Sequence, residues 1–160
     1  MAAKPPTRPK PVLMTELVLP QHTNDLGTIF GGQVMSWIDI AGAIAGRRHA
    51  HGPVVTVSID YMHFVVPIKL GYTVLIHAHV TYTGRTSMEV EVRVDAENTT
   101  TGETRRATNA YLTYVAVDEF GRARPVPPMI LKTAEEKRLH KEAEKRRAER
   151  LKWISKSKRT

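Results

Sequence analysis

The feature that most constrains this chain is a stretch from Gly32 to His49 that is apolar almost all the way round a helix. Its apolar positions are Val34, Met35, Trp37, Ile38, Ile40, Ala41, Ala43, Ile44 and Ala45. A helix with almost no polar face is normally surrounded by protein. The stretch therefore predicts a buried rod about 27 Å long. Its small residues, Ala41, Gly42, Ala43, Ala45 and Gly46, would let a sheet approach the helix backbone closely.

Alternating sequences around this helix predict an antiparallel sheet. Apolar and polar residues alternate over 54–62, 73–82 and 87–96, and a further strand is expected over 106–117. Turn signals separate these strands, and short connections imply antiparallel neighbours. With a first strand over 13–19, the order is strand, helix and four strands. This order predicts one α+β domain in which the sheet wraps the helix.

The domain is expected over residues 12–125, with a tail on each side. Residues 1–11 are rich in Lys, Arg and Pro, and predict a disordered or extended arm. Residues 126–160 predict a Pro-rich link followed by a basic helix, which a capping box of Thr133 and Glu136 opens. Because its apolar stripe is thin, we expect this helix on the surface or against a neighbouring subunit.

Charge and composition exclude several classes of protein. The net charge is +8, but residues 132–160 carry +7 of it and residues 1–131 only +1, which argues against a nucleic-acid-binding face on the domain. The chain has no cysteine, so disulfides and thiolate sites are excluded, and a reducing cytoplasm is the expected location. No stretch reaches the length of uncharged apolar sequence that a membrane span needs.

Common catalytic and metal-binding signatures are absent. There is no G-x-S-x-G elbow, phosphate-binding loop or H-E-x-x-H motif. His77 and His79 would share a strand face and could hold a metal, but no ligand in the same stretch completes a set. We expect no metal site, and a solvated sheet face at these histidines.

Asp39 lies in the middle of the apolar helix, where an unpaired carboxylate would cost several kcal/mol. It is either a structural acid bonded to the backbone or to a Ser, Thr or Tyr of the sheet, or a catalytic one. The Gly31-Gly32 pair favours catalysis, because backbone N–H groups at a helix start can bind an oxyanion. If a loop from another subunit brings Asn24 near Asp39, a base, a water-orienting amide and oxyanion donors come together.

Four segments closely resemble the hot-dog fold acyl-CoA thioesterases. They are Asn24-Asp25-Leu-Gly27-Thr28-Ile-Phe30-Gly31-Gly32, Ile38-Asp39-Ile-Ala41-Gly42-Ala43-Ile44, Arg48-His49 and Val54-Val55-Thr56-Val57. The similarity is to the branch of the bacterial acyl-CoA hydrolases and the brain- and brown-fat-type enzymes, and covers residues 13–117. It implies a long helix wrapped by an antiparallel sheet of about five strands, and a homo-oligomer with active sites at a dimer interface, commonly a trimer of dimers.

The resemblance also implies an activity, the hydrolysis of an acyl-CoA to a free acid and CoA. Asn24 matches the loop amide and Asp39 the helix acid of the family's active site, which come from opposite protomers, and the Gly31-Gly32 backbone would polarise the thioester carbonyl. Asp39 would activate water, or attack directly to give a mixed anhydride, and both routes stay open. No metal or organic cofactor is implied, because CoA is part of substrate and product.

The phosphates of CoA need a surface site. Arg85, Thr86 and Ser87, in a turn between two strands, are our candidates, with Lys69 and Arg48 as secondary ones. The basic tail could also contact these phosphates or a neighbouring protomer.

Three alternatives to a thioesterase remain open from the sequence. A non-catalytic acyl-CoA-binding protein on the same fold is the main one, and it would not need Asp39. A hydratase or dehydratase would use a His in a different motif, which His22 does not match. Nucleic-acid binding through residues 132–160 would predict affinity that falls steeply with salt.

Overall fold

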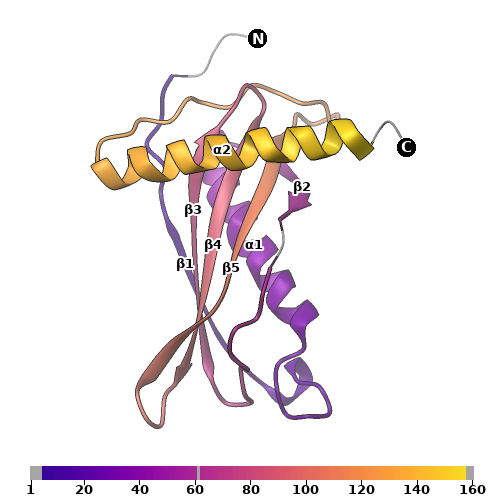
Figure 1. Cartoon of the computed structure of the whole chain (residues 1–160), viewed down its shortest axis with the longest axis vertical. Coiled ribbons are helices and arrows are strands. Elements are labelled where there is room, and N and C mark those ends of the chain that lie inside the picture. Colours follow the sequence, from indigo (N-terminus) through magenta and orange to yellow (C-terminus); the bar gives the residue numbers. More distant parts are fainter. Residues whose placement is uncertain (1–4, 61, 158–160) are drawn as a thin grey trace.

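A five-stranded antiparallel sheet lies between two long helices in the computed structural model, which describes residues 5–60 and 62–157. The elements are β1 (Val12–Leu17), η1 (Pro20–His22), α1 (Gly31–Ala50), β2 (Val54–Ile59), β3 (Thr73–Thr83), β4 (Ser87–Asn98), β5 (Glu103–Ala116) and α2 (Ala134–Ser157). The strand order is β1-β3-β4-β5-β2, so β1 and β2 form the edges. In Figure 1, α1 lies behind the sheet and α2 crosses its front. The predicted α+β fold is confirmed.

The second strand is shorter than its sequence pattern indicates. It ends at Ile59, and Tyr61, which continues the alternation, lies outside the described residues. Its pairing with β5 shifts register between Thr56 and Ser58. A register shift places an extra residue in one of the two paired strands, which interrupts the regular alternation of faces. A pattern with a strict period of two therefore predicts a strand that is too long.

The helix α1 buries one side against the sheet. Val34, Ile38, Ala41 and Ala45 are buried there, among the inward residues of β3, β4 and β5. The opposite side of α1 leaves Met35 and Ile40 exposed, so the expectation of a helix surrounded by protein is wrong for a single protomer. A sheet covers only one side of a helix, and the apolar residues opposite remain open to a further partner.

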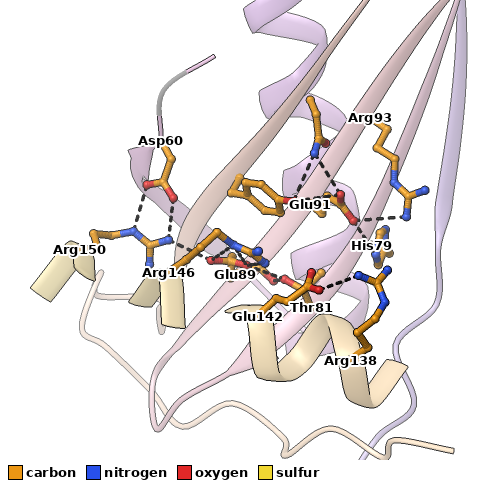
Figure 2. A network of polar contacts seen from close by, with 12 residues as sticks. Asp60, His79, Thr81, Glu89, Glu91, Arg93, Arg138, Glu142, Arg146 and Arg150 are labelled. Atoms are coloured by element: carbon orange, nitrogen blue, oxygen red, sulfur yellow. Dashed lines mark hydrogen bonds and ion pairs between the residues drawn. The ribbon is translucent and has the colours of Figure 1, made fainter. Parts of the chain in front are cut away.

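The helix α2 covers the other face of the sheet through ion pairs (Figure 2). Glu89 of β4 is only 2 % exposed. Arg146 Nη2 donates to Glu89 Oε1 at 2.7 Å, and Arg150 Nη2 lies 3.0 Å from Glu89 Oε2. Arg150 also bonds Asp60, just after β2, at 2.9 Å. The tail helix therefore lies on its own protomer's sheet, a docking that the expectation of a helix on the surface or against a neighbouring subunit did not include.

A solvated sheet face is expected at His77 and His79, and this holds for His77, which is exposed, but not for His79, which is partly buried against Glu91 of β4. His79 Nε2 lies 3.1 Å from Glu91 Oε2, and Arg93 Nη2 lies 3.3 Å away from the same oxygen. Burial raises the pKa of Glu91, but His79, Arg93 and Asn109 outweigh it and hold the pKa at about 2. Among the described residues, no group of three or more potential ligands is placed to hold a metal ion.

The arm before β1 pairs with the link before α2. Thr7 N donates to Pro128 O at 2.8 Å, and Ile130 N donates to Thr7 O at 3.0 Å. Arg8 reaches Glu136 of α2 at 3.2 Å. Residues 5–11, where we expect a disordered or extended arm, are thus extended and bonded, whereas residues 1–4 lie outside the described part of the chain. Neither long helix in the described part could span a membrane.

Replacing Glu89 by Ala should destabilise the fold by about 3 kcal/mol, because removing one partner of a buried ion pair leaves the other charge uncompensated. Here the Arg146 guanidinium loses its carboxylate. Urea unfolding measures the change. Arg138→Ala is the control, since the ion pairs of Arg138 with Glu135 and Glu142 are exposed and screened by solvent, so their loss should cost much less than the loss of Glu89. Equal costs for the two variants would show that Glu89 does not anchor α2.

Candidate active site

The carboxylate of Asp39 is held by two hydroxyl groups from the sheet. Thr56 Oγ1 of β2 donates to Asp39 Oδ1 at 2.6 Å, and Tyr114 Oη of β5 lies 3.1 Å from the same oxygen. The Tyr114 hydroxyl also lies 2.9 Å from the Asp39 backbone oxygen. The sequence left Asp39 as either a structural acid with such partners or a catalytic one. Thr56 and Tyr114 are the partners expected of a structural acid, so a catalytic role depends on whether the second carboxylate oxygen is free to act.

The second carboxylate oxygen of Asp39, Oδ2, makes no hydrogen bond within residues 5–60 and 62–157. Both hydroxyl groups act on Oδ1 instead, and together they fix the rotation of the carboxylate. The side chain is half-buried. Asp39 therefore combines a fixed orientation with one oxygen that a water molecule or a ligand can reach.

Tyr114 supplies a fixed hydrogen-bond donor. Its side chain is fully buried between the sheet and α1. Burial, and then the charge of Asp39, raise the pKa of the Tyr114 phenol, so the group keeps its proton. A Cβ at Gly42 would collide with the Tyr114 hydroxyl. Gly42 is therefore the residue that lets this hydroxyl reach the backbone of α1.

The glycine pair stands at the start of α1, as predicted. The N-cap residue, Phe30, has no side-chain atom that could accept a hydrogen bond from the first turn. Gln33 N donates to Phe30 O at 2.9 Å, but the N–H groups of Gly31 and Gly32 have no acceptor within the described residues. A Cβ on Gly32 would collide with the Phe30 ring, and one on Gly31 would lie 3.6 Å from Phe64. Phe30 and Phe64 are 61 % and 46 % exposed. Open backbone donors thus stand beside two exposed aromatic rings.

Asn24 lies in the loop before α1 and folds that loop. Its Oδ1 accepts from Leu26 N at 3.0 Å and from Thr28 N at 3.2 Å, while its Nδ2 donates to Thr28 Oγ1 at 3.0 Å. Asn24 makes no hydrogen bond to Asp39 within the part of the chain that the structure describes. One protomer therefore does not unite these two predicted site residues.

The turn of Arg85, Thr86 and Ser87 joins β3 to β4 at the end of the sheet where α1 finishes. Thr86 O accepts from Ala116 N at 3.0 Å, and Arg85 O accepts from Val126 N at 3.0 Å. Arg85 is exposed. The length of α1, about 28 Å, separates this end from the glycine pair. Within one protomer, the predicted CoA-binding turn is therefore remote from Gly31 and Gly32.

Two residues of the site were not assigned a role from the sequence. Thr56 belongs to a quoted motif, but the register shift that follows it cannot be read from an alternating pattern. Tyr114 looks like any inward-facing residue of a strand. A buried tyrosine normally needs a partner for its hydroxyl, which is the one signal that could have linked it to a buried carboxylate.

Known proteins resemble this chain over most of its length. Residues 26–103 match the model of the thioesterase superfamily. The acyl-CoA thioester hydrolase YkhA of Bacillus subtilis is 41 % identical over 139 residues, which is 87 % of this chain and 81 % of that protein. An apo-hexameric acyl-CoA thioesterase of known structure is 45 % identical with a TM-score of 0.87, and the match covers 96 % of this chain and 98 % of that one.

An acyl-CoA hydrolase from Staphylococcus aureus, solved with butyryl coenzyme A and coenzyme A, is 35 % identical with a TM-score of 0.85. The match covers 93 % of this chain and 91 % of that one. The same enzyme has been solved with an asparagine, an aspartate or a threonine replaced by alanine. In its sequence these residues are 15 and 17 positions apart.

Replacing Gly42 by Ala should destabilise the fold by about 1 to 3 kcal/mol, the usual cost of overpacking a buried contact. The new Cβ displaces the Tyr114 hydroxyl from the Asp39 backbone oxygen. Urea unfolding is the measurement, with Gly31→Ala as the control in the same helix, because a Cβ there makes only ordinary contact with Phe64. If G42A is as stable as G31A, the close approach at Tyr114 does not constrain the fold.

Proposed function

This chain belongs to the acyl-CoA thioester hydrolases of the thioesterase superfamily, and we propose that its Asp39 carries the hydrolysis of acyl-CoA to a carboxylic acid and free CoA. The identity to YkhA and the full-length match to a solved acyl-CoA thioesterase establish the family, the hot-dog fold and the thioester hydrolase activity predicted from the sequence. The roles of individual residues, the assembly and the location are proposals.

The catalytic proposal rests on how the two oxygens of the Asp39 carboxylate are hydrogen-bonded. Two hydroxyl donors hold Oδ1, and Oδ2 faces no donor among the described residues. A general base needs one oxygen oriented toward water and a second group that keeps it there. Thr56 and Tyr114 take the orienting role in this proposal.

The spacing of the site residues supports the same assignment. Asn24 and Asp39 are 15 positions apart, and Asp39 and Thr56 are 17 apart. The asparagine, aspartate and threonine that were replaced in the S. aureus hydrolase have the same two spacings. We infer that Asn24, Asp39 and Thr56 are the equivalent residues in this chain.

The reaction proposed for this site needs no group beyond the chain, the substrate and water. The N–H groups of Gly31 and Gly32 donate hydrogen bonds to the thioester oxygen and stabilise the negative charge that develops on it. Asp39 takes a proton from water as the hydroxyl attacks the carbonyl carbon. The C–S bond then breaks, and the proton returns to the CoA thiolate. Direct attack by Asp39, followed by hydrolysis of a mixed anhydride, remains the second route.

In the proposed assembly, the partner protomer places its Asn24 beside Asp39, an arrangement that one protomer alone does not have. The edge strand β2 exposes Val55 and Val57, and Val57 is 59 % exposed. Apolar residues on a free sheet edge favour pairing with a second copy. We propose a dimer joined at β2, in which the loop of Asn24 reaches Asp39 of the partner. We also propose that three such dimers form a hexamer, since the relative of known structure is hexameric.

We propose that the partner protomer's turn of Arg85, Thr86 and Ser87 contacts the CoA phosphates. The turn of the same protomer lies at the far end of α1 from Gly31 and Gly32. A cytoplasmic location is proposed on the cysteine-free sequence. No resident metal or organic cofactor is part of the proposal.

Replacing Asp39 by Asn should lower kcat at least about a hundredfold, because the base is lost while the shape is kept. Asn24→Ala should also lower kcat, by a smaller factor. Release of free thiol from acyl-CoAs of two to eighteen carbons measures both variants, and the same panel reports the preferred chain length. Circular dichroism and size-exclusion chromatography check folding and assembly. A wild-type protein that binds acyl-CoA but releases no thiol would favour the non-catalytic alternative.

Removal of either orienting hydroxyl should lower kcat about tenfold and leave KM nearly unchanged, because neither group contacts the substrate in this proposal. Tyr114→Phe keeps the buried ring, and Thr56→Val keeps the branched shape. Serine at position 56 should restore most of the rate, since it returns the donor to Asp39. Variants that lose affinity for acyl-CoA at constant kcat would contradict an orienting role.

A further inference from the structure

The segment of β2 and the residue after it contacts both long helices. Thr56 Oγ1 donates to Asp39 of α1 at 2.6 Å. Asp60, just after β2, accepts from Arg150 of α2 through both carboxylate oxygens, from Nε at 3.1 Å and from Nη2 at 2.9 Å. Figure 2 shows Arg150 bonded to Asp60 on one side and to Glu89 on the other. The proposed chemistry at Asp39 uses the first contact, and the second lies outside it.

The register shift in β2 allows one strand to reach both helices. Thr56 pairs with Tyr114, whose side chain is buried against α1. Ser58 pairs with Thr113, which is also the neighbour of Glu89 in the row of residues that α2 covers. In a regular strand, residues two positions apart share a face of the sheet. The shift places Thr56 and Ser58 on opposite faces, so the chain after it is directed to α2.

The part of β2 beyond the shift is weakly held by the sheet. In the described sheet β2 is an edge strand and pairs with β5 alone. Val57 has no partner in the ladder of the described residues, and only Ser58 and Ile59 pair with β5 after it. Strand ends with few contacts open readily. Opening from this end would therefore soon reach Thr56.

Asp60 closes this end of the strand. Its N–H donates to Tyr111 O of β5 at 2.9 Å, and its carboxylate takes both prongs of the Arg150 guanidinium, a contact with a well-defined geometry. The side chains of Arg150 and Asp60 are 14 % and 23 % exposed, so solvent screens this pair less than a surface pair. Arg150 is fixed in turn by the buried Glu89. The end of β2 is thus attached to the middle of the sheet.

We propose that Arg150 and Asp60 are positioning residues for the hydrolysis at Asp39. Through α2 they hold the end of β2, and this keeps Thr56 within hydrogen-bond distance of the Asp39 carboxylate. Neither residue reaches the reacting atoms, since α1 and α2 lie on opposite faces of the sheet (Figure 1). The inference rests on the proposed function, because it gives the orientation of Asp39 a role in catalysis.

A residue that acts through Thr56 can cost no more rate than the loss of the Thr56 hydroxyl itself. Arg150→Met and Asp60→Asn should therefore each lower kcat about threefold to tenfold and leave KM nearly unchanged. Either change combined with Thr56→Val should be no slower than Thr56→Val alone, whereas independent effects would multiply. Release of free thiol from an acyl-CoA measures all five variants.

Two variants and one control separate positioning from general damage. Arg150→Met breaks the contacts to both Asp60 and Glu89, whereas Asp60→Asn leaves Arg150 on Glu89 and so keeps α2 attached to β4. The control is Arg146→Met, which removes the same charge from α2 and a contact to Glu89 without touching Asp60. It should destabilise the fold and leave kcat unchanged. Size-exclusion chromatography checks that every variant keeps its assembly.

Amide hydrogen exchange gives a second readout that does not depend on catalysis. Peptides that cover residues 54–60 should exchange about tenfold faster in Arg150→Met and Asp60→Asn than in wild type, because the end of β2 opens more often. The same peptides in Arg146→Met, and peptides of β4 in all variants, should keep the wild-type rate. Mass spectrometry measures both sets.

The inference is overturned if Arg150→Met and Asp60→Asn keep the wild-type kcat, or if their losses multiply with that of Thr56→Val. Unchanged exchange over residues 54–60 would also overturn it, as would an equal loss of kcat in Arg146→Met. Full activity in Asp39→Asn would instead contradict the proposed function, and the exchange rates would still report how firmly β2 is held. The two failures are therefore distinguishable.

Discussion

The close approach of α1 to β5 at Gly42 is the constraint on which the site depends. The Tyr114 hydroxyl occupies the space that any larger residue at Gly42 would fill. From there it contacts both the backbone and the carboxylate of Asp39. One contact thus fixes how far α1 lies from the sheet and how Asp39 is turned. It also explains how a carboxylate can lie in an apolar helix, because its partners come from the strands underneath.

The two helices are attached to the sheet by different interactions. Burial of apolar side chains holds α1, and this interaction has little directional preference. Guanidinium–carboxylate pairs hold α2, and replacing such pairs by apolar residues is often neutral for stability. Their value here is geometric, because Arg150 bridges Glu89 of β4 and Asp60 just after β2. The tail helix therefore ties the strand that carries Thr56 to the middle of the sheet.

The sequence predicted most of the fold because the periods of helix and strand are local properties. It also singled out Asp39 and the glycine pair as candidates. A charged residue in an apolar helix and two glycines at a helix start can both be recognised from neighbouring residues in the sequence. The docking of α2 could not be predicted, because Arg146 and Arg150 look like the other cations of the charge run until Glu89 is placed beneath them. Tyr114 was missed for the same reason, since its partner is 75 residues away.

The register shift of β2 has a consequence for how copies of this chain can associate. A flat, regular edge strand accepts further strands without limit and leads to aggregates. The edge of β2 is interrupted after Thr56, and its neighbour across a twofold axis would carry the same interruption. In the dimer proposed at β2, the two interrupted edges would face each other, and neither β2 would remain free to take up a further strand. Association through β2 would thus end at two copies, and of the two edge strands only β1 would stay open.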